Sequence, residues 1–233
     1  MTNVKFNTAL IVGAGSGLSA SLARALAKDG VKVALAARST GDLDPLAKDI
    51  GARTFACDAS QRADVEKLFA ALDASVGAPE IVIYNASFRT RGPLIELDPA
   101  DVEKSIAVSA YGGFLVAQQA ARRMLRKRRG AILLTGASAS VKGYALSAPF
   151  AMGKFALRGL AQSMARELAP QGIHVAHVVI DGGIKSARRE ESADKPESML
   201  DPDAIAATYL HLIQQPRSAW AWEIELRPWL ERF

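Results

Sequence analysis

The chain has 233 residues, 49% hydrophobic and 23% charged, with 18 glycines and one cysteine, a composition that excludes disordered, collagen-like, coiled-coil and disulfide-stapled proteins. No apolar run approaches the roughly 20 residues of a membrane-spanning helix, and no signal peptide precedes the first strand-like segment, so we expect a cytoplasmic protein without a membrane partner. Six basic residues between Arg122 and Arg129 account for the net charge of +5, because the other 23 Lys and Arg are balanced by 24 Asp and Glu. The cluster suits a solvated helix end, and we expect no nucleic-acid partner.

Short apolar and β-branched runs predict the strands, and most are continuous, as in strands that are buried on both faces of a parallel sheet. The predicted strands are Ala9–Val12, Val31–Ala36, Thr54–Ala56, Ile81–Tyr84, Ala131–Leu134, Ile173–Ile180 and the less apolar Trp222–Leu226. The predicted helices are Leu18–Lys28, Asp64–Leu72, a long helix from Asp98 to about Arg128, Pro149–Leu168, and one from Asp201 to about Gln214.

Strand and helix alternate from end to end, and no linker divides the chain. This order predicts a doubly wound, Rossmann-type α/β fold with a mostly parallel seven-stranded sheet and helices on both faces. We therefore expect one nucleotide-binding domain over residues 1–233.

A glycine-rich turn connects the first strand to the first helix. It contains Gly13, Gly15, Ser16 and Gly17 and runs into the helix at Leu18. Such a turn lets the backbone approach a pyrophosphate at a helix N-terminus, where free N–H groups and the helix dipole favour anions. These five residues are therefore predicted to bind a dinucleotide.

The end of the second strand indicates which dinucleotide binds. An NAD site usually has an acidic residue here, about 20 residues after the turn, to accept from the ribose hydroxyl. This chain has Arg38 and Ser39 instead. An arginine pairs with the 2′-phosphate of NADP through its planar fork, so NADP is preferred over NAD.

The motifs, taken in order, resemble the short-chain dehydrogenase/reductase family over essentially the whole chain. The matching segments are Gly13–Ser19, Cys57–Ala59, Asn85–Ser87, Val108–Phe114, Thr135–Ser140, Lys154 and Asp181–Gly183. The resemblance implies a nicotinamide cofactor, a small carbonyl or alcohol substrate, and a homodimer or homotetramer. It also implies further cofactor contacts from Asp58, Ala59, Asn85, Ala86, Lys154, Gly183 and Ile184.

The chain departs from the family at the residues that move protons. In the family, a tyrosine four residues before the lysine exchanges a proton with the substrate oxygen, and the lysine lowers the pKa of that tyrosine. Lys154 matches the lysine, but the tyrosine position holds Phe150, and the position of a helper asparagine holds Ser109. A phenyl ring carries no transferable proton, so the usual general acid is missing.

Other side chains are candidates for the missing roles. The position of the family's carbonyl-binding serine is Ala137, and Ser138 next to it takes that role after a local shift. Tyr144, on a loop that borders the substrate in this family, is the first candidate for a surrogate acid, and Tyr111 is the second. The alternative for both tyrosines is that their rings only form an aromatic wall of the pocket and transfer no proton.

Two functions stay open at this point. The first is an NADP(H)-dependent oxidoreductase with weakened proton transfer, since losing general acid catalysis slows hydride transfer without forbidding it. The second is a catalytically silent NAD(P)-binding protein, acting as a sensor, a partner subunit or a vestigial enzyme. Residues 186–200, polar and aperiodic, take the place of the family's substrate lid. No histidine or cysteine spacing predicts a metal site.

Overall fold

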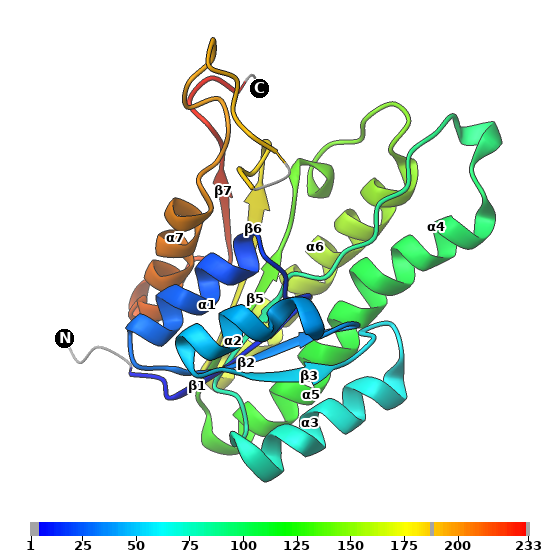
Figure 1. Cartoon of the computed structure of the whole chain (residues 1–233). Helices are drawn as coiled ribbons and strands as arrows, with labels where there is room; N and C mark the ends of the chain where they lie inside the picture. Colours follow the sequence, from blue (N-terminus) through cyan, green and yellow to red (C-terminus); the bar gives the residue numbers. More distant parts are fainter. Residues whose placement is uncertain (1–4, 187–188, 232–233) are drawn as a thin grey trace.

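The computed structural model describes residues 5–186 and 189–231. Seven strands form one parallel sheet in the order β3-β2-β1-β4-β5-β6-β7, which confirms the predicted doubly wound fold (Figure 1). The strands are β1 (Thr8–Val12), β2 (Lys32–Ala37), β3 (Arg53–Ala56), β4 (Ile81–Tyr84), β5 (Gly130–Thr135), β6 (Ile173–Ile180) and β7 (Glu223–Leu226). Because the strand order reverses between β1 and β4, a ligand crevice is expected at the carboxyl ends of these two strands.

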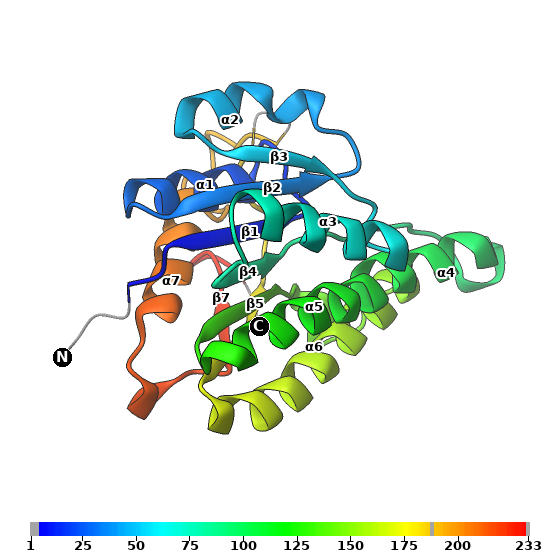
Figure 2. The ribbon, with the colours of Figure 1, turned by 90° about the horizontal axis from the view of Figure 1, so that it is seen from below.

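Helices cover both faces of the sheet (Figure 2). They are α1 (Leu18–Lys28), α2 (Asp44–Ile50), α3 (Arg62–Ser75), α4 (Pro99–Ile106), α5 (Gly112–Lys127), α6 (Ala148–Leu168) and α7 (Pro202–Gln214). Side chains of α1, α2 and α7 share one buried cluster with Ile11 of β1, and side chains of α3, α5 and α6 share another with Leu10 and Val12. Successive β1 residues thus point into opposite cores, as in a strand buried on both faces.

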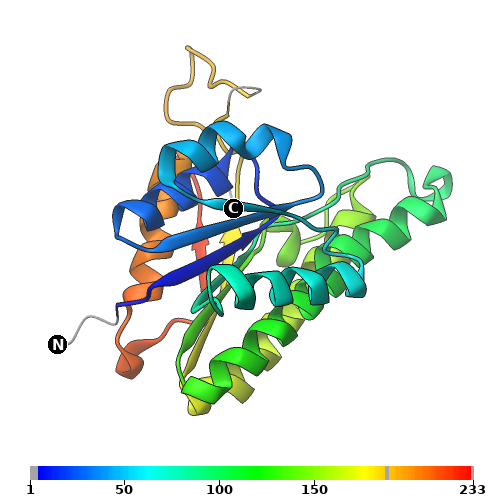
Figure 3. The ribbon, with the colours of Figure 1, turned by 60° about the horizontal axis from the view of Figure 1, so that its bottom comes forward.

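Two helical features differ from the sequence prediction. Helix α2 was not predicted, because a seven-residue helix that buries only Leu46 has too few periodic positions to stand out. The predicted long helix is interrupted by a π-helical turn, Ala107–Tyr111. Gly153 of α6 packs against this turn so closely that a Cβ on it would lie 2.8 Å from the Cβ of Ser109. Figure 3 shows α4 continuing outward from α5, beyond the sheet.

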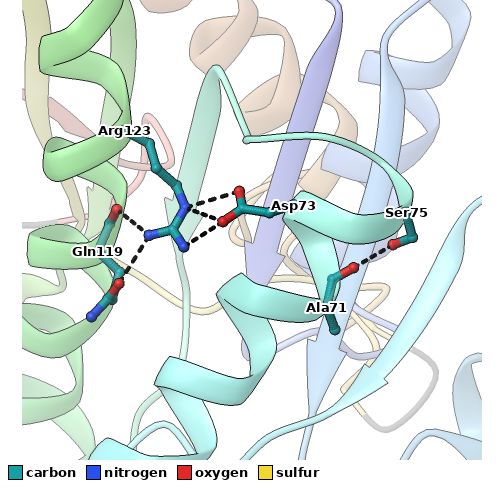
Figure 4. A network of polar contacts seen from close by, with 5 residues as sticks. All are labelled: Ala71, Asp73, Ser75, Gln119 and Arg123. Atoms are coloured by element: carbon teal, nitrogen blue, oxygen red, sulfur yellow. Dashed lines mark hydrogen bonds and ion pairs between the residues drawn. The ribbon is translucent and has the colours of Figure 1, made fainter.

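The basic cluster near the end of α5 is more than a solvated helix end. Arg123 forms a bidentate ion pair with Asp73 of α3 and also donates to Gln119 (Figure 4). Arg129 donates to the Lys5 carbonyl. Part of the basic excess therefore holds elements together. Across the described residues, no helix is both long and apolar enough to span a bilayer.

Candidate active site

Two adjoining cavities lie at the carboxyl ends of the central strands. The first, of about 550 Å³, is lined by Val12, Gly13, Ala14, Ala37, Arg38, Ser39, Cys57, Asp58, Ala59, Asn85, Ala86, Ser87, Phe88 and Val108. The second, of about 370 Å³, is lined mainly by residues that follow β4, β5 and β6 and by the start of α6. Asn85 and Ser87 line both cavities, so the two form one continuous cleft.

The glycine turn is tied to the end of β4. Gly13 has φ +83°, and a Cβ there would lie 2.3 Å from the backbone nitrogen of Ala86, so a side chain is excluded. The Ser19 hydroxyl donates to the Gly13 carbonyl at 3.0 Å, and the Asn85 amide donates to Ser19 Oγ at 2.7 Å. Ser19 therefore links the turn to Asn85, the residue that follows β4.

The N-terminus of α1 fits the pyrophosphate of a dinucleotide. Its N-cap residue is Gly17, which offers no side chain to the free N–H groups, and no acidic residue stands in its first turn. A Cβ on Gly15 or Gly17 would meet no described atom within 4 Å, so the backbone is open to a ligand. Gly15, Ser16, Gly17 and Leu18 continue the turn beyond the cavity lining, while Gly13 lies within it.

The far end of the first cavity fits an adenosine with a 2′-phosphate. Arg38 is exposed at its rim and forms no ion pair within the described part of the chain. Partial burial opposes ionisation of Asp58, but hydrogen bonds from Ser60 outweigh it and lower the pKa of that carboxyl. Burial, followed by the charges of Asp64 and Asp58, raises the pKa of Cys57 to about 11, so this thiol stays protonated.

Lys154 and Phe150, one turn apart on α6, both line the second cavity. Lys154 is 3% exposed, and its Nζ donates to the Thr135 carbonyl at 2.7 Å. Burial lowers the pKa of Lys154 to about 8. The Phe150 ring lies with its centroid 5.8 Å from the Lys154 Nζ, so the position that would hold a phenol holds only carbon.

Some of the polar side chains around Phe150 already have hydrogen-bond partners within the protein, and others do not. Ser138 is half-buried in the lining, and its hydroxyl has no partner among the described residues. Ser140 is fully buried and accepts from the Ala137 N–H at 3.1 Å. Tyr144 also lines the cavity, 46% exposed. The pKa of Lys142 is raised, first by its hydrogen bond to Asp181 and then by its contact with the Tyr144 side chain. Lys142 therefore places a cation beside this tyrosine.

Several predicted residues stand behind or outside the cavities in the described structure. Tyr111 stacks on Phe114 at 6.2 Å, outside both linings. Ser109 is buried behind the cleft, where its hydroxyl accepts from the Phe88 N–H at 3.5 Å. Gly183 is a backbone partner of Leu200, whereas its neighbours Gly182 and Ile184 line the second cavity.

The predicted lid segment begins and ends on this backbone pairing. Leu200 donates to Gly183 at 2.8 Å, and Lys185 donates to Leu200 at 2.9 Å, which closes the base of the loop. The loop projects beyond the carboxyl ends of β6 and β7 (Figures 1 and 3). Arg189 from this loop lines the second cavity. Positions 187 and 188 of the predicted lid lie outside the described residues.

Some residues of the cavity lining were not predicted from the sequence. Arg89 and Arg189 line the second cavity, and so does Ser147, the N-cap residue of α6. A signal for Arg89 existed: it stands four residues after Asn85, in the loop that follows a central strand. Whether Arg89 lines the cavity depends on the direction of its side chain, and the sequence of a loop does not determine that direction.

A buried network lies beneath Lys154. His177 of β6 is fully buried, with its Nδ1 2.9 Å from Glu223, and Glu223 is paired with Arg158 at 2.6 Å. Burial lowers the pKa of His177 to about 4, against the opposing effect of Glu223, so the imidazole is neutral near pH 7. His174 instead bonds to the Ala221 carbonyl, away from this network. Across the described residues, no group of three or more metal-ligating side chains gathers.

Known proteins are similar to this chain over most of its length. A family model described as short chain dehydrogenase matches residues 7–197. A short-chain dehydrogenase structure from Rhodopseudomonas palustris is 36% identical, with a TM-score of 0.82, and the match covers 96% of this chain and 99% of that one. The 3-oxoacyl-[acyl-carrier-protein] reductase MabA of Mycobacterium bovis is 31% identical over 75% of this chain and 68% of its own length. A metagenomic short-chain oxidoreductase in complex with NADP is 26% identical, with a TM-score of 0.84, over 97% of this chain and 98% of its own.

Proposed function

The chain belongs to the short-chain dehydrogenase family, and on that premise we propose that it is an NADP(H)-dependent oxidoreductase of a small carbonyl or alcohol, with weakened proton transfer. One observation carries the proposal: buried Lys154 opens onto the same continuous cleft as the glycine turn. Burying a lysine this deeply costs free energy, and a ligand with hydroxyl and phosphate groups would provide polar partners for its charge.

NADP is the preferred cofactor, with NAD as the alternative. Arg38 at the rim offers a planar cation for a 2′-phosphate, and the strand before it ends without an acid. The metagenomic relative is a complex with NADP. Equal thermal stabilisation by NADP and NAD would remove the role given to Arg38, and Arg38→Gln should reduce the NADP preference at least tenfold.

Each residue has a distinct task in this proposal. The bound cofactor supplies a hydride to the carbonyl carbon, and the oxygen takes up a proton to give the alcohol. Lys154 holds the nicotinamide ribose, and Ser138 donates to the substrate oxygen. Tyr144 or a water molecule provides the proton in place of a phenol at Phe150, and the Lys142 cation stands beside Tyr144.

A second function is supported by Phe150 itself. A protein that binds NADP(H) without efficient chemistry has no use for a phenol at this position, and neither would a sensor or a partner subunit. Both functions predict cofactor binding, so binding does not separate them. Turnover does.

The proposal also covers assembly and location. It includes one domain over residues 1–233, a substrate lid at 186–200, and a homodimer or homotetramer formed through α5 and α6. Tyr111, Phe114, Met152 and Phe155, on these helices and the turn before them, are 41–50% exposed, which is unusual for large apolar side chains unless they are covered. The buried thiol of Cys57 fits a reducing compartment such as the cytoplasm.

The test is NADPH oxidation against a broad panel of aldehydes and ketones. Wild type is compared with Lys154→Met, which keeps a side chain of similar length but removes the charge. We expect slow turnover of at least one carbonyl by wild type and a loss of 100-fold or more in the variant. A wild-type protein that binds NADPH but is silent on the whole panel would favour the second function.

A further inference from the structure

The second cavity is strongly cationic. Its lining includes Arg89, Arg189 and Lys154, and among the lining residues that the structure describes there is no aspartate or glutamate. The uncharged polar groups around it are donors or can donate. They include Asn85, Ser87, Ser138 and Ser147. A pocket of this kind is built to receive negative charge.

The backbone that carries Arg89 is held firmly. The Ser105 hydroxyl donates to the Phe88 carbonyl at 3.0 Å, and the Phe88 N–H donates to the Ser109 hydroxyl at 3.5 Å. The guanidinium carbon of Arg89 lies 5.0 Å from the centroid of the Phe150 ring. Arg89 is therefore stacked against the residue that replaces the family's tyrosine, and Ser109 serves to position it.

No carboxylate of the described chain neutralises the two arginines. Neither forms an ion pair with a described residue. Asp181, next to two lining residues, is paired with Lys142 at 3.3 Å, and Glu191 with Lys185 at 2.8 Å. Glu190, which follows Arg189 in the chain, is exposed and lies outside the lining. The charge of the cavity is thus available to a ligand.

Like charges crowd around Arg89. Burial lowers the pKa of Arg89, and the nearby charges of Arg91 and Arg189 lower it further. The arginine stays protonated, because its ordinary pKa is far above neutrality. A bound anion would relieve this repulsion and gain charge-assisted hydrogen bonds from the planar guanidinium.

We infer that the substrate carries a carboxylate or phosphate, which Arg89 and Arg189 bind beside the reacting carbon. The inference rests on the proposed oxidoreductase function and names its substrate class. The Phe150 ring is a common neighbour of Arg89 and Lys154, at 5.0 Å and 5.8 Å from its centroid, so an anion on Arg89 lies close to a carbonyl held near Lys154. A short oxo acid fits: its carbonyl carbon gains a hydride, its oxygen gains a proton, and a hydroxy acid and oxidised NADP are released.

The first experiment measures binding and does not depend on turnover. The NADP-saturated protein is titrated calorimetrically with oxamate, which is anionic and not reducible, and with its neutral amide, oxamide. We expect oxamate to bind at least tenfold more tightly, as charge-assisted hydrogen bonds allow. The preference should fall to about twofold or less in Arg89→Gln, stay partly in Arg89→Lys, and persist in Arg91→Gln, a control from the same loop.

The second experiment measures turnover with matched substrates. Pyruvate and acetoacetate are compared with their methyl esters, and dihydroxyacetone phosphate is compared with dihydroxyacetone. These pairs separate a carboxylate from a phosphate as the preferred anion. A preference for the charged member that disappears in Arg89→Gln, with an unchanged NADPH affinity, supports the inference.

The outcomes separate the inference from the proposed function. Equal binding of oxamate and oxamide overturns the inference, even if neutral ketones are reduced. It is also overturned if Arg89→Gln and Arg189→Gln weaken NADP binding but leave the anion preference intact, because the two arginines would then serve the cofactor phosphates. If oxamate is preferred but no carbonyl is turned over, the anion site stands and the oxidoreductase function fails.

Discussion

At the scale of single residues, Phe150 has the clearest consequence for chemistry. It stands four residues before Lys154, and its ring is close to both that lysine and Arg89. We expect Phe150→Tyr to raise kcat for reduction by about 10- to 1,000-fold, because general acid catalysis contributes about 10²–10⁴-fold when the acid is well placed. The measurement is kcat for NADPH oxidation with the best carbonyl of the panel, from pH 6 to pH 9.

A control keeps that result interpretable. Tyr144→Phe removes the proposed surrogate acid and should reduce wild-type turnover more than it reduces turnover of Phe150→Tyr. If Phe150→Tyr is folded, binds NADPH normally and is no faster than wild type, then Phe150 is not the reason for slow proton transfer. Wild-type rates unaffected by Tyr144→Phe would leave water as the proton source.

The buried imidazole of His177 couples stability to acid. Its pKa is about 4 in the folded protein, against about 6.5 in an unfolded chain, so the unfolded state takes up a proton first as the pH falls. The stability that the neutral imidazole contributes is complete above pH 6.5 and is lost between pH 6.5 and pH 4. The loss is up to about 3 kcal/mol at 1.36 kcal/mol per pKa unit.

Urea unfolding at pH 7 and at pH 4.5 measures this coupling. His177→Gln keeps a donor toward Glu223 and should lose less stability between the two pH values than wild type. His211→Gln, an exposed position on α7, is the matched control and should behave as wild type does. An identical pH dependence in wild type and His177→Gln would show that another group titrates.

Site residues could be predicted from the sequence where the backbone conformation itself requires a particular residue type. The turn at Gly13 was predictable because only glycine tolerates its φ and its approach to Ala86. Arg89 was not, because its importance comes from a stack against Phe150 that joins two loops far apart in the chain. Tyr209 shows the same limit: it lies on α7, far along the chain from Lys154, yet its hydroxyl lies 2.8 Å from that of Thr135, whose carbonyl accepts from Lys154.

At the scale of elements, a bidentate ion pair outside the site connects α3 and α5. Arg123 reaches both oxygens of Asp73 and lies over the Phe69 ring at 4.9 Å. Its side chain is 17% exposed. We expect Arg123→Ala to lower the free energy of unfolding by about 1–2 kcal/mol, since a bidentate, partly buried pair exceeds the usual value of an exposed one.

Denaturant unfolding of Arg126→Ala provides the comparison. Arg126 lies on the same helix, is exposed, and has no charged partner in the described structure. This variant should change the stability by less than about 0.5 kcal/mol. Similar losses in both variants would mean that the network in Figure 4 contributes little beyond general charge on α5.

Element boundaries were predictable wherever local chemistry marks them. Asp98 and Asp201 cap α4 and α7 through their carboxylates, and each is followed by proline at the first helical position, as expected. The π-helical turn has no such mark. It forms where α6 approaches at Gly153, so it depends on a neighbour about 45 residues away and not on local preference.

At the scale of the whole molecule, an uncovered apolar face predicts self-association. Figure 2 shows α5 and α6 side by side on the outside of the sheet. A groove of about 380 Å³ runs between them, and Phe114 of α5 stands at its edge. Phe114 and Phe155 are 41% and 44% exposed, and such a pair on a monomer would leave a large apolar patch in water.

We expect a homodimer through this face, because it would bury the patch and bring opposite charges together. Arg122 and Glu167 both line the groove, one on each helix, so a two-fold axis between two copies would bring each arginine toward the partner's glutamate. We expect light scattering after size exclusion to give a dimer or tetramer for wild type and a monomer for Phe114→Glu with Phe155→Glu. The exposed Leu94→Glu, outside α5 and α6, is the control and should leave the mass unchanged. Because both phenylalanines lie outside the two cleft linings, a monomeric variant that still binds NADPH would separate assembly from cofactor binding, and an unchanged mass would mean that another face makes the contact.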